Sequence, residues 1–330
     1  MTENHPKLKF GKTGILLINL GTPNSTSWFD IRKYLKEFLS DRRVIEVNPF
    51  IWKIILNLFI LNFRPSKTAE AYKKIWMKEK NMSPLRYYTE SQSIKLSSEI
   101  GSENIIVDYA MRYGNPSIKS KIFDLHKLGC ENLVVLPLYP QYAAATTATV
   151  CDEVYRTLMK MRWQPNLNII PHYESEPLYI DALVNSLNTK ISEIKWEPDL
   201  IIASYHGIPK KYFDKGDPYH CYCQKTTRLI SEKFKKFEIK TTFQSRFGPQ
   251  EWLKPYTDKV IENLPKEGKK NILVICPGFS SDCVETLEEI SIQGKEIFLK
   301  AGGINFEAIP CLNDNKDHIQ LFKYLINKRL

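Results

Sequence analysis

Short β-rich runs alternate along the whole chain with stretches that have the periodicity of amphipathic helices. Four runs lie in the first half and four in the second: "GILLINLG" (14–21), "IIVDYAMRY" (105–113), "NLVVLPLYP" (132–140), "LNIIPHY" (167–173), "DLIIASYHG" (199–207), "TTFQSR" (241–246), "NILVICPG" (271–278) and "FEAIP" (306–310). Helical periodicity falls between them at 116–129, 147–162, 220–236, 282–301 and 315–328. Strands that alternate with helices form βαβ units and parallel sheets with helices on both faces. The sequence therefore predicts an α/β fold.

The four-plus-four arrangement predicts two similar doubly wound domains, each with a four-stranded parallel sheet. A chain of 330 residues is long for one domain and sufficient for two. We place an N-terminal α/β domain at 1–180 and a C-terminal α/β domain at 181–330, with a helical bridge from Glu174 to Pro198. The last helix, at 315–328, is a candidate to pack back on the first domain.

The first two strands are separated by far more chain than the other neighbouring strands. The excess, at about 41–85, is predicted to be an insertion with a purpose of its own. It contains "PFIWKIILNLFILNF" (49–63), in which eleven of fifteen residues are large and apolar. This segment is too short to span a bilayer, which needs about 20 residues. It is either a buried core helix or a helix that lies on a membrane surface, with apolar contacts from Phe50, Trp52, Ile55, Leu58, Phe59 and Phe63.

The carboxyl ends of the predicted strands define the expected ligand cleft, because open α/β sheets bind ligands there. Those ends carry Asn19, Leu20, Gly21, Arg112, Tyr113, Tyr139, Pro140, His206, Gly207, Ser245, Arg246 and Phe279 to Ser281. His206 ends the fifth strand, where Gly207 and Pro209 force a turn. Imidazole titrates near neutrality and can accept a proton or ligate a metal of borderline softness. His206 is thus a candidate catalytic residue, with a purely structural role as the alternative.

Acidic residues cluster in "PGFSSDCVETLEEI" (277–290). If Asp282 opens a helix, Asp282, Glu285 and Glu289 fall on one face. A capping box, with Asp282 at the N-cap and Glu285 three residues later, explains the first two acids. It does not explain Glu289. The alternative is a column of carboxylates that leads a divalent cation from water toward His206.

Several common functions lack their usual sequence patterns. No G-x-G-x-x-G follows the first strand, and neither G-x-x-x-x-G-K-[ST] nor G-x-S-x-G occurs. The net charge of +10 comes with scattered lysines and no arginine-rich block, so we interpret it as a solvated surface and expect no nucleic-acid partner. Seven cysteines without a secretory signal indicate reduced thiols. We therefore expect a cytoplasmic protein, with peripheral membrane contact through 49–63 on one of the two interpretations of that segment.

Seven motifs in order and spacing resemble those of the ferrochelatases, which insert Fe²⁺ into a porphyrin: "INLGTP", "DYAMRYGNPS", "LPLYPQYAAATT", "SYHGIP", "KGDPYHCYCQKT", "FQSRFGPQEWLKPYTD" and "PGFSSDCVETLEEI". The resemblance runs from Gly14 almost to the C-terminus. It implies the chelatase fold, in which two similar α/β domains enclose a porphyrin cleft. It also implies protoporphyrin IX and Fe²⁺ as substrates.

The resemblance also implies roles for individual residues. His206 matches the active-site histidine of the family and Glu285 its essential glutamate, both in contact with the metal. Asp282 and Glu289 match acids along the proposed metal or proton path. Residues that match the porphyrin site are Leu20, Arg64, Lys67, Tyr72, Arg112, Tyr113, Tyr139 and Ser245.

Two departures from family patterns are visible. Cys283 stands where animal enzymes have a histidine, and Leu20 replaces a methionine found in some relatives. Some ferrochelatases bind a [2Fe–2S] cluster through one internal and three C-terminal cysteines. Here Ala144 occupies the internal position and no cysteine follows Cys311. We therefore expect no cluster and no other cofactor, with iron as a substrate.

The resemblance suggests how the residues act. Metallation exchanges two pyrrole protons for Fe²⁺, and a cleft that holds the ring bent exposes the nitrogen lone pairs. His206 is then the general base, while Glu285, with Asp282 and Glu289, removes water from the iron or carries protons away. "CVE" at 283–285 and the apolar insertion resemble protoporphyrin enzymes of Gram-negative bacteria. The alternatives are a coproporphyrin-metallating enzyme, a cobalt or nickel chelatase for a corrinoid-type ring, and a non-catalytic porphyrin or haem carrier.

Overall fold

The structure is a computed structural model that describes residues 9–330. It contains two four-stranded parallel sheets. The first has the order β2-β1-β3-β4 and is built from β1 (Lys12–Thr22), β2 (Ile105–Gly114), β3 (Cys130–Pro137) and β4 (Asn166–Ile169). The second has the order β6-β5-β7-β8 and is built from β5 (Leu200–His206), β6 (Ile239–Gln244), β7 (Asn271–Ile275) and β8 (Asn305–Ala308). The strand order is the same in both halves, and the predicted fold class is confirmed.

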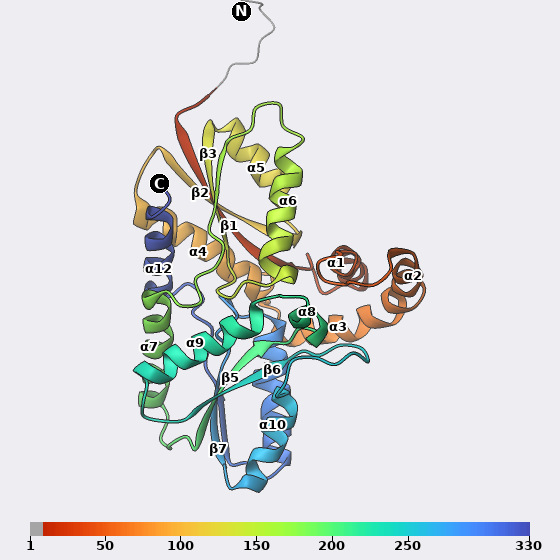
Figure 1. Ribbon diagram of the computed structural model, residues 1–330, viewed down its shortest axis with the longest axis vertical. Helices are drawn as coiled ribbons and strands as arrows, with labels where there is room; N and C mark the ends of the chain where they lie inside the picture. The colour runs from red at the N-terminus through yellow and green to blue at the C-terminus, as the bar shows by residue number, and fades with distance from the viewer. Residues whose placement is uncertain (1–8) are drawn as a thin grey trace, which may run out of the picture.

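Helices flank both sheets, and the two halves lie one above the other along the longest axis of the molecule (Figure 1). The α-helices are α1 (Trp28–Leu39), α2 (Pro49–Ile55), α3 (Leu61–Ile75), α4 (Pro84–Ile100), α5 (Ile118–Lys127), α6 (Thr149–Leu158), α7 (Pro177–Glu193), α8 (Lys210–Asp214), α9 (Tyr219–Lys233), α10 (Thr257–Asn263), α11 (Lys295–Lys300) and α12 (Lys316–Asn327). Three short π-helical segments, η1 (Leu56–Ile60), η2 (Ala144–Ala148) and η4 (Glu285–Gly294), and one 3₁₀ turn, η3 (Leu264–Glu267), complete them.

The strands bury both faces, as the strands of parallel sheets do. In β1, Ile15 and Leu17 join one apolar cluster, while Leu16 and Ile18 join another on the opposite face. The first of these clusters continues into the second half through β5, α7 and α12. Helix α12 packs against α4 and α7, so the C-terminal helix contacts the N-terminal half. Position 180 falls inside α7, which runs between the two halves.

The topology places a binding crevice at two points. In each half the first strand lies between the second and third strands of that half, so successive connections leave it in opposite directions. A crevice opens beyond the carboxyl ends of the strands at such a switch point. The ends of β1 and β3, and of β5 and β7, are therefore the positions where this fold exposes side chains to a ligand.

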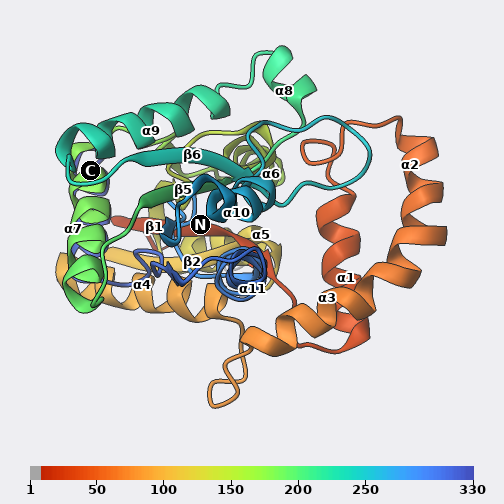
Figure 2. The same ribbon diagram turned by 90° about the horizontal axis from the view of Figure 1, so that it is seen from below.

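The insertion between β1 and β2 forms a helical arm that we call the lip, defined as α2, η1 and α3. The lip projects to one side of the molecule together with α1 (Figures 1 and 2). Phe50 is 82% exposed and Phe63 is 76% exposed, so the core-helix interpretation of 49–63 is wrong. Trp52 and Leu56 are the inward exceptions. Trp52 Nε1 donates to the Leu39 carbonyl of α1 over 2.6 Å, and Leu56 is buried.

Of the other apolar contacts predicted for this segment, Leu58 and Phe59 are exposed and Ile55 is partly exposed. Within residues 9–330, no helix combines the length and the hydropathy that crossing a membrane requires.

Candidate active site

A cavity of about 780 Å³, counting the space at its open mouth, lies at the carboxyl ends of both sheets. The ends of β1 and β3 contribute Asn19, Leu20, Gly21, Leu138 and Tyr139, and those of β5 and β7 contribute His206 and the segment from Gly278 to Ser281. Helix α1 adds Tyr34, α3 adds Tyr72 and Ile75, and the start of η4 adds Glu285. Apolar and aromatic walls with a few convergent polar groups are typical of sites for small molecules and cofactors. The cavity therefore occupies the crevice that the topology predicts in both halves.

His206 is the last residue of β5 and is half-buried at the cavity wall. Its Nδ1 lies 2.6 Å from the Gly207 carbonyl oxygen. A carbonyl can only accept, so Nδ1 carries the proton and Nε2 retains a lone pair in the neutral ring. Gly207 is required by close packing, because a Cβ there would lie 3.0 Å from the Gln244 carbonyl oxygen. The turn thus fixes the tautomer that can accept a proton at Nε2.

Glu285 and Glu289 lie one turn apart at the start of η4. The Gln244 side chain donates to the Glu285 carbonyl over 2.8 Å, and the Ser245 amide donates to Glu289 Oε1 over 2.8 Å. The Ser245 hydroxyl also donates to Glu289. Burial raises the pKa of Glu289, and the charge of Glu285 adds to this, while hydrogen bonds from Ser245 and the charge of His206 oppose it. Glu285 and His206 therefore lie close enough to Glu289 for their charges to affect its pKa.

Asp282 lies before the helix that carries Glu285 and Glu289. The helix begins at Glu285 after Val284, so neither the capping box nor a helical face shared with Asp282 forms. The Asp282 carboxylate is buried and accepts from the Asn313 amide over 2.7 Å. Among residues 9–330, no group of three or more His, Cys, Asp or Glu side chains is arranged to hold a metal ion. The expected helical alignment of three acids is thus wrong for Asp282.

The predicted porphyrin contacts do not all lie at the cavity, and Ser245 binds Glu289 instead of lining it. Leu20, Tyr72 and Tyr139 line the cavity. The Arg64 guanidinium instead stacks on the Phe247 ring, 4.2 Å from its centroid. Burial lowers the pKa of Arg64 and the charge of Glu285 raises it, which places the two side chains within electrostatic range. Lys67 is exposed on the next turn of α3.

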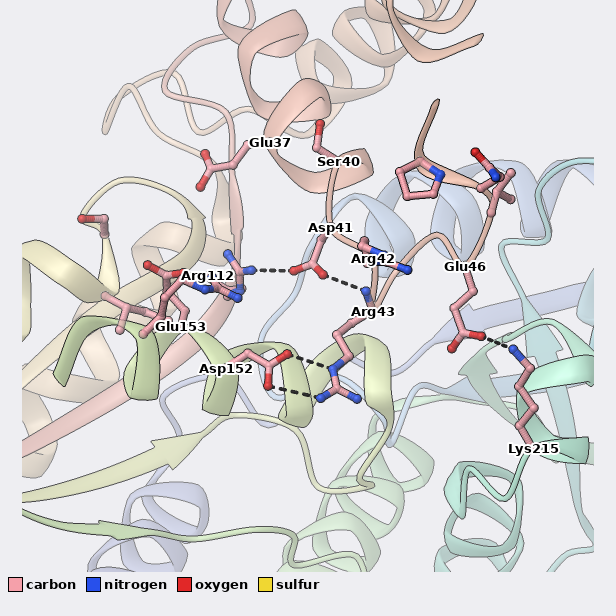
Figure 3. A pocket seen from close by; sticks show the side chains of 16 residues that line it. Glu37, Ser40, Asp41, Arg42, Arg43, Glu46, Arg112, Asp152, Glu153 and Lys215 are labelled. Atoms are coloured by element: carbon pink, nitrogen blue, oxygen red, sulfur yellow. Dashed lines mark hydrogen bonds and ion pairs between the residues drawn. The ribbon is translucent and has the colours of Figure 1, made fainter. Parts of the chain in front are cut away.

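Arg112 and Tyr113 are not brought to the cavity. Arg112 lies in a separate surface pocket, where it binds Asp41 (Figure 3). The hydroxyl of the fully buried Tyr113 donates to the same carboxylate over 3.0 Å. Burial alone raises the pKa of Asp41, but hydrogen bonds from Thr149 and the Arg43 amide, with the charge of Arg112, bring it below its usual value. A half-buried anion needs a cation nearby, so Arg112 points toward Asp41 and not toward the cavity.

Tyr34 and Gln141 are among the cavity residues that were not predicted from the sequence. Tyr34 looks like an ordinary core position of α1, but it lines the cavity, and burial raises its pKa with added contributions from Tyr72 and Glu285. Within the described part of the chain, Tyr139 Oη, Gln141 Oε1 and Ser280 Oγ are buried without a hydrogen-bond partner. All three residues line the cavity. Gln141 comes two residues after Tyr139 in "LPLYPQY", so its position just after β3 is the feature from which it could have been predicted.

Comparison with known proteins identifies the family. The model of the family described as Ferrochelatase matches residues 12–330. The chain belongs to the ferrochelatase family. This confirms the family expected from the seven motifs and, with it, a metal–porphyrin chelatase.

Similar proteins named ferrochelatase come from several bacteria. One from Allorhizobium ampelinum is 53% identical over 100% of this chain and 97% of its own length. One from Rhizobium meliloti is 53% identical over 99% and 97%. One from Francisella tularensis subsp. novicida is 49% identical over 98% and 97%.

Solved structures of more distant proteins share the fold. SirB from Bacillus subtilis, solved with Fe³⁺, has a TM-score of 0.57 at 12% identity, covering 96% of this chain and 95% of its own. CbiX, described as the terminal enzyme for biosynthesis of sirohaem in denitrifying bacteria, has a TM-score of 0.52 at 10% identity, covering 96% and 99%. At such identities the likeness shows the chelatase-like fold alone.

Proposed function

We propose that this ferrochelatase inserts Fe²⁺ into protoporphyrin IX to give protohaem, the last step of haem biosynthesis. The observation that carries the proposal is that His206 and Glu285 line one cavity whose other walls are mainly apolar and aromatic. A base and a carboxylate meet there at a surface suited to a flat macrocycle. A carrier of porphyrin or haem needs such walls but has no use for Glu285 and Glu289.

The charge distribution around the cavity favours a substrate with two propionates. Among the described residues, no lysine or arginine lines the cavity, whose apolar walls include Ile75, Leu85 and Leu138. Arg64 and Lys67 on α3 supply two cations for two propionates. Coproporphyrin has four, so two of them would be buried without a cation, which is unfavourable. We therefore favour protoporphyrin over coproporphyrin.

In the proposed mechanism the cavity holds the ring distorted and His206 accepts the pyrrole protons. A neutral imidazole with a free Nε2 lone pair is the group that can do this near neutral pH. Strain in the ring is offset by contacts elsewhere on the macrocycle, such as those with Leu20 and Tyr139. Glu285 faces the same space and is placed to exchange water on the incoming Fe²⁺, since hard oxygen ligands suit a hydrated divalent cation.

Glu289 is the group that we propose to move protons away from the site. Its raised pKa brings the protonated and ionised forms closer in free energy at neutral pH. The same carboxylate is fixed by Ser245, so it accepts protons without changing position. Protons then pass from His206 through this acid toward solvent.

Substrate choice is tested by anaerobic Fe²⁺ insertion into protoporphyrin IX and coproporphyrin side by side. We expect kcat/KM to be at least roughly ten-fold higher for protoporphyrin, the factor that about 1.4 kcal/mol of unpaired charge gives. A preference for coproporphyrin would contradict the substrate assignment. Binding of both without turnover would instead indicate a carrier, and faster metallation of a corrinoid-type ring with Co²⁺ or Ni²⁺ would indicate the third alternative.

We also propose that the protein is cytoplasmic and that it contacts the inner face of the cytoplasmic membrane peripherally through the lip. Exposed apolar side chains gather on α2 and η1 and at the start of α3: Phe50, Ile51, Ile54, Leu58, Phe59 and Phe63. Protoporphyrin partitions into membranes, so a cleft beside such a surface reaches its substrate there. Surface binding requires buried apolar area and nearby cations, and Lys53, Arg64 and Lys67 lie on the same segment.

Vesicle sedimentation with anionic lipid tests the lip. We expect the wild type to bind reversibly and Phe50→Ser/Leu58→Ser/Phe63→Ser to lose binding while remaining folded, because all three side chains are exposed. The control is Met159→Ser/Ile304→Ser, two similarly exposed apolar residues outside the lip. Equal binding by the lip variant and its control would contradict the proposal. Trp52 and Leu56 are left unchanged because they pack against other parts of the protein.

We propose that the enzyme works without an iron–sulfur cluster or another resident cofactor. Ala144 stands at the internal position that a cluster ligand takes in some relatives. The seven cysteines are dispersed, and Cys221 is the exposed one among them. Four ligands are needed for a [2Fe–2S] cluster, and the described residues offer no such set.

A further inference from the structure

We propose that Asp282 is a positioning residue, which with Asn313 and Gln92 holds the segment that carries Glu285, and that it is not part of a metal or proton path. The proposal rests on the proposed function, because it assigns Asp282 a role in that reaction. It replaces the role that the family resemblance implies for this acid. Three sets of contacts carry it.

The first is a reciprocal pairing between Asp282 and Asn313. The Asp282 amide donates to Asn313 Oδ1 over 2.8 Å, and Asn313 Nδ2 donates to Asp282 Oδ2 over 2.7 Å. Two bonds between the same two residues fix both the position and the orientation of the backbone at 282. Both residues are buried, which makes such a pairing stronger and its loss more severe.

The second set uses the remaining acceptor capacity of Asp282. Its Oδ1 accepts from Thr286 Oγ1 over 2.9 Å and from the Cys311 amide over 3.2 Å. Thr286 Oγ1 in turn accepts from the Cys283 amide over 3.0 Å. Thr286 is the neighbour of Glu285 in the first turn of η4, so these bonds set the direction in which η4 starts. A carboxylate that is 5% exposed and engaged by three donors is poorly placed to exchange ions or protons with the cavity.

The third set connects this network to the other half of the molecule. Gln92 is buried on α4, and its Nε2 lies 2.7 Å from the Asn313 carbonyl oxygen, 3.1 Å from Ser281 Oγ and 3.3 Å from the Ser280 carbonyl oxygen. Asn313 adopts a left-handed backbone conformation, with φ of +47°. Such a conformation is unfavourable for a residue with a side chain unless its surroundings impose it. The side-chain amide of Gln92, in the N-terminal half, thus binds two loops of the C-terminal half: the loop with Ser280 and Ser281, and the loop with Asn313.

An exchange of the two side chains separates positioning from chemistry. Asp282→Asn leaves two amide groups facing each other, and Asn313→Asp leaves two carboxylates facing each other. The double variant Asp282→Asn/Asn313→Asp restores the pairing with donor and acceptor reversed. In it, the carboxamide at position 282 can donate to the carboxylate at position 313, and the backbone amide of 282 still meets an oxygen. The carboxylate, however, has moved from 282 to 313.

The readouts are kcat and KM for anaerobic Fe²⁺ insertion, with porphyrin binding followed by fluorescence quenching. We expect each single variant to lower kcat by roughly 10- to 100-fold, as a mispaired buried polar group does when it displaces a reacting residue. We expect the double variant to recover to within roughly three-fold of the wild type, a coupling that only neighbouring residues show. Porphyrin KM should stay nearly constant, because Asp282 does not line the cavity.

A matched control removes a different acid from the same loop. Asp314 forms an ion pair with Lys95 nearer the surface, so Asp314→Asn should retain wild-type kcat. If the double variant is folded and as inactive as Asp282→Asn, the charge at 282 is what the reaction needs and the positioning proposal is wrong.

Gln92→Met keeps the proposal testable where a single variant fails to fold. It removes the hydrogen bonds from Gln92 to the two loops without changing a charge, and we expect it to lower kcat by at least roughly ten-fold. Full activity of Gln92→Met would overturn the proposal. An inactive wild type is a separate result, which overturns the proposed function and this proposal with it.

Discussion

Acid should loosen the loop that contains Asn313, because His318 lies beside it in the first turn of α12. The ring is fully buried, and its Nδ1 lies 2.7 Å from the carbonyl oxygen of Asn313. Within residues 9–330, Nε2 has no hydrogen-bond partner. Burial lowers the pKa of His318 to about 4, while the hydrogen bond to Asn313 and the charge of Asp314 partly oppose this. The folded protein therefore holds a neutral imidazole beside the residue that pairs with Asp282.

The size of the effect follows from the two pKa values. Histidine in an unfolded chain has a pKa near 6.5, so below that pH the unfolded state binds a proton that the folded state rejects. The stabilising contribution is complete above about pH 7.5 and is lost as the pH falls from 6.5 toward 4. At pH 5 the linkage relation gives a loss of about 2 kcal/mol relative to pH 8.

The assay is urea unfolding of the wild type and His318→Gln at pH 8 and pH 5, followed by tryptophan fluorescence. Glutamine keeps a donor for the Asn313 carbonyl but does not titrate. The wild type should lose about 2 kcal/mol more than the variant between the two pH values, because all other titrating groups cancel in the comparison. An equal loss in both proteins would refute the reasoning, since it would mean that His318 titrates alike in the folded and unfolded states.

Further predictions concern the site and its surroundings. Glu285→Gln should keep the fold and lose at least roughly 100-fold in kcat for iron insertion, and equal activity would contradict its role. Because burial raises the pKa of Glu289, its ionisation opposes folding, so Glu289→Gln should gain thermal stability over the wild type as the pH rises from 4 to 8. Arg112→Met should lower the unfolding free energy by about 3 kcal/mol by stranding its carboxylate partner, with porphyrin KM unchanged. Phe247→Ala should raise porphyrin KM by roughly two- to five-fold by freeing Arg64, the effect of a lost cation–π contact. Anaerobically purified protein should contain no acid-labile sulfide, and one sulfide per iron would contradict the absence of a cluster.

The regular part of the fold could be predicted because its signals are local. The alternation of Ile15 to Ile18 between two faces of β1, and the helical periodicity of 315–328, follow directly from strand and helix geometry. The eight predicted strands coincide with the observed ones to within a few residues at most ends. The carboxyl ends of the predicted strands then placed His206 at the expected cleft.

The start of η4 could not be predicted in the same way. The spacing of Asp282 and Glu285 fits a capping box in an ideal α-helix, but the segment forms a π-helix that begins later. The deciding contacts come from Asn313 and Gln92, which are distant in sequence, and no local pattern marks them as partners of Asp282. A long-range pairing therefore overrode the local capping preference.

Arg112 and the lip illustrate two other limits. Arg112 lies near the carboxyl end of β2, beside the expected cleft, yet the direction of its side chain depends on Asp41 in the loop after α1. For 49–63 the composition allowed both a core helix and a surface helix, because apolar content alone does not reveal which neighbours are present. Only the packing of Trp52 and Leu56 against other parts of the protein, with Phe50 outside, distinguishes the two.

The central claim is that His206 accepts pyrrole protons in a cavity that binds the porphyrin without it. The most direct measurement is the initial rate of anaerobic Fe²⁺ insertion by His206→Ala at saturating protoporphyrin, with binding of the porphyrin measured on the same sample. The account predicts a rate lower by at least roughly 100-fold, as expected on removing a general base, and a porphyrin Kd within a few-fold of the wild type. A folded His206→Ala variant that binds protoporphyrin and inserts iron at nearly the wild-type rate would contradict it.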